Sequence, residues 1–261
     1  MPTPHVLFHI DGPIAVVTIN RPDARNAMTW DMYEGLVEAC ERVDLHDDLR
    51  VVVLRSTGDK AFISGTDISQ FTQFQTAEAP IDYERRIDHV IDRLEHVRVP
   101  TIAQVQGVAA GGGCAIALAC DMRVCSPEAR FGVPIARTLG NCLSAANYAR
   151  LIDLIGPART KDILFTGRLI EAAEAEALGL VTRLAPMNEL DTVVRSLATA
   201  LAANAPLTIR ATKEAVRRIQ AHRRVEASLI DDLISMCYGS ADFMEGVAAF
   251  LAKRPPQFTG R

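Results

Sequence analysis

Two short segments that combine glycine with apolar residues place the strongest constraint on how this chain folds. Residues 62–68 read Phe-Ile-Ser-Gly-Thr-Asp-Ile, and residues 106–115 read Gln-Gly-Val-Ala-Ala-Gly-Gly-Gly-Cys-Ala. Glycine beside a hydrophobic run lets bare backbone approach another group closely. Two backbone N–H groups aimed at one oxygen form an oxyanion hole, which stabilises charge developing on a carbonyl. Close helix–sheet packing is the alternative role for the glycine triplet, but its pairing with the first segment favours the oxyanion hole.

Size and charge limit the classes of protein to which this chain can belong. The chain has 261 residues, of which 49% are hydrophobic, and a formal net charge of −4 at pH 7. These values suit one compact globular unit, or one main domain with an appendage, with ample material for a core. The mild acidity gives no reason to expect nucleic acid or an anionic membrane as a partner.

The sequence carries no signal for a membrane span, a leader or a metal site. No apolar stretch reaches the roughly 20 residues needed to cross a bilayer, and the first residues lack the basic and apolar regions of a signal peptide. The six cysteines include no C-x-x-C pair and no neighbouring histidine at metal-ligand spacing. We therefore expect a cytoplasmic protein with reduced thiols and no metal.

Hydrophobic periodicity predicts an α/β architecture. Alternating apolar residues around the turn at 11–13 indicate a hairpin, and Thr29 is placed to cap a helix that runs to Val43. The continuously apolar run at 51–54 is typical of a strand buried on both faces. Further strands are expected at 102–105 and 122–125, a buried helix at 113–119, and C-terminal helices at 190–203, 206–220, 225–236 and 241–253.

Seven motifs occur in a fixed order along the chain, at residues 20–28, 62–68, 100–107 with the following glycine triplet, 119–123, 130–134, 175–181 and 245–255. Through these motifs the chain resembles the crotonase (enoyl-CoA hydratase/isomerase) superfamily nearly end to end. The resemblance implies a spiral of ββα units followed by an α-helical trimerisation region, assembled as a homotrimer or a dimer of trimers. We therefore expect a crotonase-like core with the acyl-CoA site over residues 1–195 and a helical oligomerisation region over residues 196–261.

The same resemblance implies an acyl-CoA thioester as ligand, with coenzyme A entering as part of the substrate and no separate cofactor. The thioester oxygen would lie between the backbone N–H groups of Ser64 and Gly112, at the positive end of the helix that follows the triplet. The positions that match the family's substrate-binding residues are Arg25, Ala27, Gly65, Thr66, Asp67, Phe250 and Lys253. The alternative to substrate binding is solvated surface charge for Arg25 and Lys253, and an ordinary apolar helix face for Phe250.

The chain departs from the hydratases of this family at two positions. Hydration of an enoyl thioester needs an acid–base group that activates water and protonates the α-carbon, and those hydratases supply two glutamates. The first follows the glycine triplet, where this chain has Ala115, and the second follows Phe-Gly-x-Pro, where it has Ile135. Neither side chain transfers a proton, so efficient classical hydration is not predicted.

Other side chains are candidates for the acid–base role. Cys142 stands where the aryl-CoA dehalogenase branch has a nucleophilic aspartate, and Arg137 would lower its pKa. A buried, inert thiol is the alternative. His89 lies on a helix predicted over residues 81–98, whose buried apolar stripe would cover the acyl pocket, but the polar face that His89 shares favours a solvated role. Tyr83 and Glu84 on that helix are further candidates for the pocket.

Three functions remain open on the sequence. The first, which we predict, is an acyl-CoA enzyme of the hydratase/isomerase type that polarises a CoA thioester and stabilises an enolate. The second is another crotonase chemistry, such as thioester hydrolysis, C–C cleavage, decarboxylation or dehalogenation. The third is a catalytically silent trimer that binds acyl-CoA.

Overall fold

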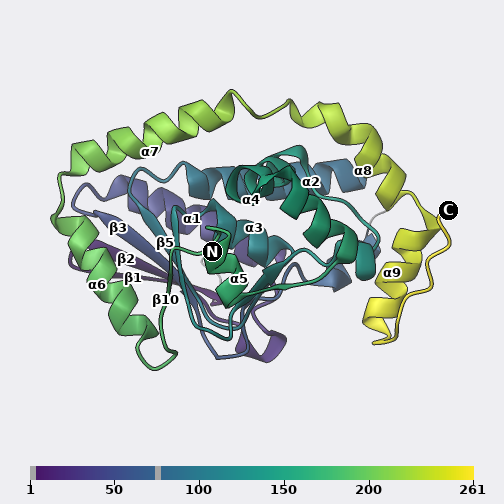
Figure 1. Ribbon diagram of the computed structural model, residues 1–261, viewed down its shortest axis with the longest axis horizontal. Helices are drawn as coiled ribbons and strands as arrows, with labels where there is room; N and C mark the ends of the chain where they lie inside the picture. Colours follow the sequence, from purple (N-terminus) through teal and green to yellow (C-terminus); the bar gives the residue numbers. More distant parts are fainter. Residues whose placement is uncertain (1–3, 74–77) are drawn as a thin grey trace.

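Two β-sheets, built from strands that alternate along the chain, form the centre of the fold (Figure 1). The computed structural model describes residues 4–73 and 78–261. The larger sheet has the spatial order β1 (Val6–Asp11), β2 (Ile14–Ile19), β3 (Val51–Ser56), β5 (Thr101–Val105), β7 (Met122–Cys125) and β10 (Arg183–Leu184). The smaller sheet has the order β4 (Ala61–Ile63), β6 (Val108–Ala110), β8 (Arg130–Gly132) and β9 (Ile170–Glu171).

The middle of the chain winds as a spiral of three ββα turns. Each turn contributes one strand to each sheet, so that β3, β5 and β7 pair in parallel in one sheet while β4, β6 and β8 pair in parallel in the other. Each pair of strands is followed by a helix, because parallel strands need a crossover connection. The predicted crotonase-like spiral is thereby confirmed. The three helices are α2 (Ala79–Glu95), α3 (Gly112–Ala119) and α4 (Ala145–Thr166).

The N-terminal elements follow the sequence pattern closely. Strands β1 and β2 form the predicted antiparallel hairpin, with Val6 opposite Ile19 and Asp11 opposite Ile14. Helix α1 (Trp30–Leu45) begins after Thr29, whose backbone is extended as a cap requires but whose side chain makes no capping hydrogen bond. The hairpin extends the larger sheet by two strands.

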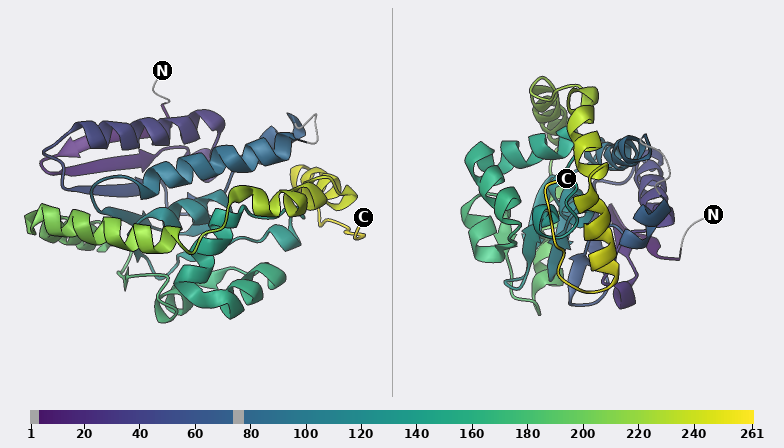
Figure 2. Two further views of the ribbon diagram at one scale, coloured as in Figure 1. Left: turned by 90° about the horizontal axis from the view of Figure 1, so that it is seen from above. Right: turned by 90° about the vertical axis from the view of Figure 1, so that its right-hand side faces the viewer.

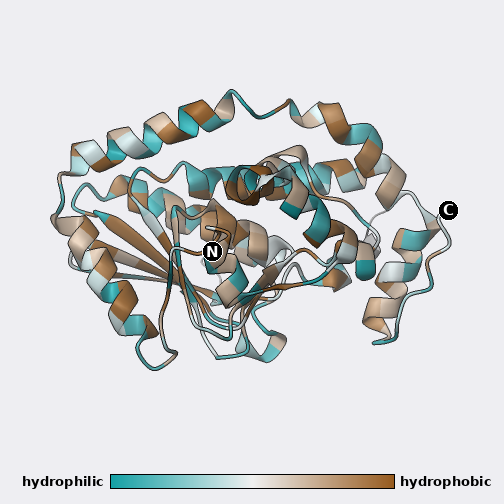
Figure 3. Ribbon diagram, in the orientation of Figure 1, coloured by the Kyte–Doolittle hydropathy of each residue, from teal (hydrophilic) through white to brown (hydrophobic). Residues whose placement is uncertain are grey.

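Strand β3 shows why the sequence of a central strand of the larger sheet is continuously apolar. Val52 and Leu54 face the main core with α1, while Val51 and Val53 face a second apolar cluster beneath α6 (Leu190–Ala203). Successive side chains of a strand point to opposite faces, so both faces are covered. The central strands are accordingly drawn in the hydrophobic colour along their length (Figure 3).

The C-terminal part is helical, as predicted. Helix α6 runs across residue 195 and packs on the larger sheet, so the expected boundary at 195/196 falls inside a core helix and the division into two units stays a prediction. Helices α7 (Pro206–Ala221) and α8 (Asp231–Tyr238) then arch over one side, and α9 (Ala241–Leu251) lies near the C-terminus (Figures 1 and 2). The helix expected at 225–236 is wrong at its start, because residues 227–230 form a 3₁₀ turn before α8.

Three further expectations from the sequence concern membrane spans, the thiols and the bounds of α2. No helix within 4–73 and 78–261 is long and apolar enough to cross a membrane. All six cysteines are free thiols, five of them buried. Helix α2, expected over 81–98, ends at Glu95, although Val97 beyond it is still buried with the predicted apolar stripe of α2.

Candidate active site

The two glycine-bearing segments leave the same edge of the smaller sheet. Strands β4 and β6 are parallel neighbours, so their carboxyl ends lie side by side. The loop of residues 64–67 follows β4, and the turn into α3 follows β6. A Cβ atom placed on Gly65 would lie 3.4 Å from the Ala110 carbonyl oxygen, and one placed on Gly111 would lie 3.8 Å from the Gly65 Cα. The two loops therefore run next to each other.

The three glycines of the triplet have different roles. Gly111 has a φ of 53°, a conformation that favours glycine. A Cβ on Gly113 would lie 2.1 Å from the Ile63 carbonyl oxygen, so this glycine is needed for α3 to pack against β4. Gly112 is the first residue of α3, and within the described chain its N–H has no hydrogen-bond acceptor. The packing alternative thus accounts for Gly113 and leaves the Gly112 N–H free.

In the other loop, the Thr66 N–H is free and the Ser64 N–H is not. Ser64 donates to the Arg25 carbonyl oxygen at 3.2 Å. Met28 forms a parallel bridge to Thr66 by donating to Gly65 and accepting from Asp67. In such a bridge the N–H of the central residue points the other way, and no acceptor in the described part of the chain lies within hydrogen-bond distance of the Thr66 N–H.

Two tyrosines hold Thr66 in place. Its Oγ1 is 2.8 Å from the Tyr33 hydroxyl and 2.9 Å from the Tyr83 hydroxyl. Burial raises the pKa of both tyrosines, which keeps them neutral hydrogen-bonding groups. Tyr33 comes from α1 and Tyr83 from α2, so two helices of the core fix the position of this loop.

A cavity of about 630 Å³ opens where the two loops meet. Both Thr66 and Gly112 line it, and its walls are mainly apolar side chains of α2 and of the segment that follows β8, such as Ile87, Val133 and Leu139. A concave, mostly apolar cavity with a few polar groups is the usual form of a small-molecule site.

Carboxyl groups are scarce in this cavity. Among the described residues that line it, Asp67 and Glu84 carry them. Burial acts to raise the pKa of Asp67, but hydrogen bonds from Ser69 and Arg21 more than offset this and lower it. The Arg21 guanidinium lies 2.8 Å from Asp67 Oδ2, so Asp67 is an ionised part of the loop structure.

Glu84 is in a different environment. It is 5% exposed, and Tyr238 of α8 donates a hydrogen bond to its Oε1 at 2.5 Å. Burial raises the pKa of Glu84 to about 8, with Asp88 adding to the rise and hydrogen bonds from Tyr238 and the Ser144 backbone opposing it. Asn141 Nδ2 in turn donates to the Tyr238 hydroxyl at 3.0 Å. Helices α2 and α8, which are remote in sequence, are brought together here (Figure 1).

Comparison with known proteins identifies the family. The family model described as enoyl-CoA hydratase/isomerase matches residues 9–261. The chain belongs to the enoyl-CoA hydratase/isomerase family. It is 35% identical over 257 residues to the "Probable enoyl-CoA hydratase echA8" of Mycobacterium tuberculosis, and the aligned region covers 98% of each chain. It is 33% identical over 251 residues to the short-chain-enoyl-CoA hydratase of Clostridium acetobutylicum, and the aligned region covers 96% of this chain and 95% of that protein.

A solved structure agrees with this assignment. The enoyl-CoA hydratase from Mycobacterium avium subsp. paratuberculosis superimposes with a TM-score of 0.86 at 28% identity, covering 99% of this chain and 100% of that one. The resemblance found in the sequence, to the enoyl-CoA hydratase/isomerase superfamily, is thereby confirmed, as is the α/β fold class.

The substrate-binding residues expected from the family pattern largely border the cavity. Arg25, Ala27, Gly65, Thr66, Asp67 and Phe250 line it. Phe250 is 52% exposed, so its ring is half open to solvent. Lys253 is exposed and is not among the described lining residues. The positions where hydratases of the family were expected to have glutamates, Ala115 and Ile135, both line the cavity and supply only apolar surface.

Cys142 and His89, the two side chains predicted as catalytic candidates, differ in their position relative to the cavity. Cys142 lines the cavity but is buried, and burial raises the pKa of its thiol, with Cys237 and Glu84 adding to the rise. Such a thiol stays protonated, and Arg137 is not among the groups that shift it. His89 is exposed on α2 and lies outside the described lining of the cavity.

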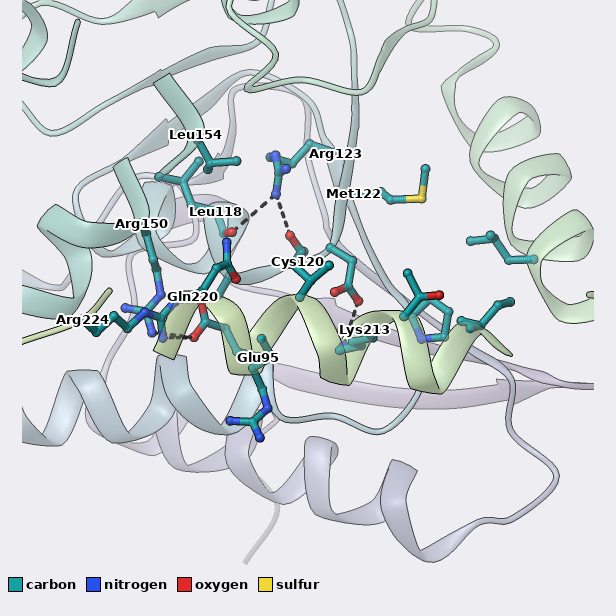
Figure 4. Close-up of a pocket in the computed structure, with 18 of the residues that line it drawn as sticks. Glu95, Leu118, Cys120, Met122, Arg123, Arg150, Leu154, Lys213, Gln220 and Arg224 are labelled. Atoms are coloured by element: carbon teal, nitrogen blue, oxygen red, sulfur yellow. Dashed lines mark hydrogen bonds and ion pairs between the residues drawn. The ribbon is translucent and has the colours of Figure 1, made fainter. Parts of the chain in front are cut away.

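A second cavity, of about 500 Å³, lies between α7 and the body of the protein (Figure 4). Its charged side chains are already paired within the chain. Arg150 and Arg224 both bind Glu95, with nitrogen–oxygen distances of 2.7 and 2.8 Å, and Lys213 lies 2.7 Å from Asp121. The Lys213 and Arg224 pairs attach α7 and the residues just beyond it to the core.

Proposed function

We propose that this protein acts on an acyl-CoA thioester, whose carbonyl oxygen it holds between the backbone N–H groups of Thr66 and Gly112. The observation that carries the proposal is that neither N–H group has an acceptor among the described residues, while both belong to adjacent loops and border one apolar cavity. Removing a proton next to the carbonyl places negative charge on that oxygen, and two preorganised donors stabilise the resulting enolate. Ser64, expected from the family pattern to be the first donor, is already hydrogen-bonded to Arg25.

The helix that begins at Gly112 supports the same role. Helix α3 is almost entirely buried and begins at the cavity, so its unpaired N-terminal N–H groups carry partial positive charge toward the bound oxygen. The Arg25 and Arg130 side chains also border the cavity, and a guanidinium pairs well with the phosphates of coenzyme A. The apolar walls suit the acyl chain.

The experiment that tests this proposal measures polarisation of a bound thioester directly. A conjugated ester such as cinnamoyl-CoA absorbs at longer wavelength when its carbonyl is polarised, so the protein should shift this band on binding. Thr66→Pro removes the N–H, whereas Thr66→Ala removes the hydroxyl and keeps the N–H. We expect the shift to be lost in the proline variant and retained in the alanine variant, with exchange of the α-protons of butyryl-CoA slower in the proline variant by about 10²–10³. A shift of equal size in both variants would refute Thr66 as a donor.

We also propose that the chain assembles as a homotrimer or a dimer of trimers through its C-terminal helices. Several large apolar side chains of α7, α8 and the turn between them are exposed in the single chain: Leu207, Val216, Ile219, Leu229, Leu233 and Met236. Exposed apolar groups gathered on one region mark an interaction surface. Light scattering coupled to gel filtration should give three or six times the mass of 28.4 kDa.

A further inference from the structure

Glu84 is the carboxyl group of the cavity that is left without a structural counter-charge. Asp67, the other carboxyl among the described lining residues, is tied to Arg21 and Ser69. No cation is among the groups that shift the pKa of Glu84, and the carboxyl is buried in the wall of the same cavity as Thr66 and Gly112. Carboxyl groups are rarely buried unless they are paired with a cation.

The hydrogen bonds around Glu84 orient its carboxyl. Because Asn141 Nδ2 donates to the Tyr238 oxygen, the Tyr238 proton points at Glu84 Oε1. Oε1 therefore accepts this hydrogen bond in both protonation states of the carboxyl. The Ser144 backbone N–H also donates to the carboxyl, so two donors from outside α2 fix its position in the cavity wall.

The environment also sets the proton affinity of the group in a useful range. Burial raises the pKa of Glu84 to about 8. Acid–base catalysis is most effective when the pKa of the group lies near the working pH. Asp67, with its lowered pKa, is a much weaker base.

We infer that Glu84 is the general base of this site and removes a proton from the carbon next to the thioester carbonyl. This inference rests on the proposed function, because it needs a thioester oxygen held by Thr66 and Gly112. The proton goes to the Glu84 carboxylate, the electron pair of the C–H bond becomes the C=C bond of the enolate, and the negative charge moves to the held oxygen. Return of the proton to the same carbon restores the thioester, and return to the γ-carbon of a conjugated enolate moves the double bond.

A buried Glu–Tyr–Asn cluster that only stabilises the fold is the competing explanation. The two explanations differ in what they predict for exchange of the α-protons with solvent. A structural cluster affects stability and leaves the exchange chemistry to another group, whereas a general base controls the exchange itself. The assay is therefore incubation of butyryl-CoA in D₂O, with deuterium uptake at the α-carbon followed by mass spectrometry.

We expect wild type to exchange the α-protons, and Glu84→Gln to slow the exchange by 10²–10⁴ with unchanged affinity for butyryl-CoA in isothermal titration. Asp82→Asn, the same chemical change at an exposed position of the same helix, should leave the rate unchanged. Glu84→Asp keeps a carboxyl and should retain slow exchange, which gives a second variant if Glu84→Gln does not fold. Equal exchange by wild type and Glu84→Gln would overturn the inference, as would binding of butyryl-CoA by wild type without exchange. Absence of binding by wild type would instead show that the proposed function fails.

The dependence of the exchange rate on pH provides an independent test. A base must be deprotonated to act, so the wild-type rate should rise with pH and level off above the pKa of about 8. The Tyr238 hydrogen bond lowers this pKa and the Asp88 charge raises it, so Tyr238→Phe should move the inflection to higher pH and Asp88→Asn to lower pH. An inflection that moves in neither variant would contradict the assignment. The titratable groups that interact with Glu84 are Tyr33 of α1, Tyr83 and Asp88 of α2, Cys142 before α4, Tyr148 of α4 and Tyr238 of α8.

Discussion

Glu95 should contribute more to the stability of this protein than any exposed ion pair, because it attaches three elements through buried charges. It is the last residue of α2, and its carboxylate binds Arg150 of α4 and Arg224 just beyond α7. Its side chain is 14% exposed and that of Arg150 is 3% exposed. Burial acts to raise the pKa of Glu95, but the hydrogen bonds from both arginines outweigh it and lower the pKa from 4.5 to about 2.

The size of the effect follows from the pKa. A carboxyl whose pKa falls from 4.5 to about 2 on folding contributes ~3 kcal/mol at neutral pH. Since the folded pKa is the lower one, this stability is fully present above about pH 4.5 and is lost as the pH falls toward 2. Glu95→Gln should therefore lower the free energy of unfolding by ~3 kcal/mol at pH 7, a value close to the cost of breaking a buried ion pair.

The matched control is Glu245→Gln. The pKa of Glu245 is also lowered to about 2, by hydrogen bonds from Arg254 and Gln257, but this pair lies at the surface. Solvent screens such a pair, so little stability should be lost. Urea unfolding followed by circular dichroism, at one protomer concentration and at pH 7 and 3.5, gives both differences. Equal losses for the two variants, or a Glu95→Gln loss that does not shrink at pH 3.5, would refute the reasoning.

Three further substitutions test the geometry of the loops and of α2. Gly113→Ala places a Cβ 2.1 Å from the Ile63 carbonyl oxygen, so we expect a loss of at least ~1–3 kcal/mol in urea unfolding, because backbone cannot move aside easily. Gly112→Ala places a Cβ 2.5 Å from the Tyr33 hydroxyl but 3.8 Å from the ring carbon that carries it. The same Cβ lies 3.3 Å from Thr66 Oγ1, so adding Tyr33→Phe should restore part of the affinity for butyryl-CoA that Gly112→Ala loses, and a double variant weaker than Gly112→Ala would contradict the clash with Tyr33. His89→Ala, at an exposed position of α2, should leave α-proton exchange within a few fold of wild type, and a hundredfold loss would return His89 to the catalytic candidates.

The fold could be read from the sequence where local pattern and packing agree. The apolar run of β3 predicts a strand buried on both faces, and the structure places apolar clusters on either side of it. The start of α8 could not be predicted, because Val225 and Leu229 have helical spacing but remain exposed, and residues 227–230 form a 3₁₀ turn. Apolar spacing and propensity alone do not fix the residue at which a helix begins.

Only part of the site could be predicted from the sequence, because some of its features depend on tertiary contacts. The two glycine segments indicate where backbone approaches backbone, but the identity of the free N–H depends on a tertiary contact, the Ser64 bond to Arg25. A signal for Glu84 was present in the spacing, since it lies three residues before Ile87 and seven before Ile91 on the buried face of α2. A carboxyl on an apolar stripe is unusual and points to a functional role. Its partner Tyr238 could not be found, because it comes from α8, 154 residues away.

The placement of Glu84 has an energetic consequence that can be measured. Its folded pKa of about 8 lies above the ordinary value of 4.5, so the folded state holds this proton more tightly than the unfolded state does. Stability should then fall as the pH rises from about 4.5 to 8, by an amount on the order of 3 kcal/mol at pH 7. Glutamine carries no ionisable group, so Glu84→Gln should gain stability relative to wild type between pH 5 and 8 in urea unfolding. A difference that is constant with pH would show that Glu84 ionises as easily in the folded chain as in the unfolded one. A gain in stability together with a loss of proton exchange is the pattern expected of a group that serves proton transfer at the expense of the fold.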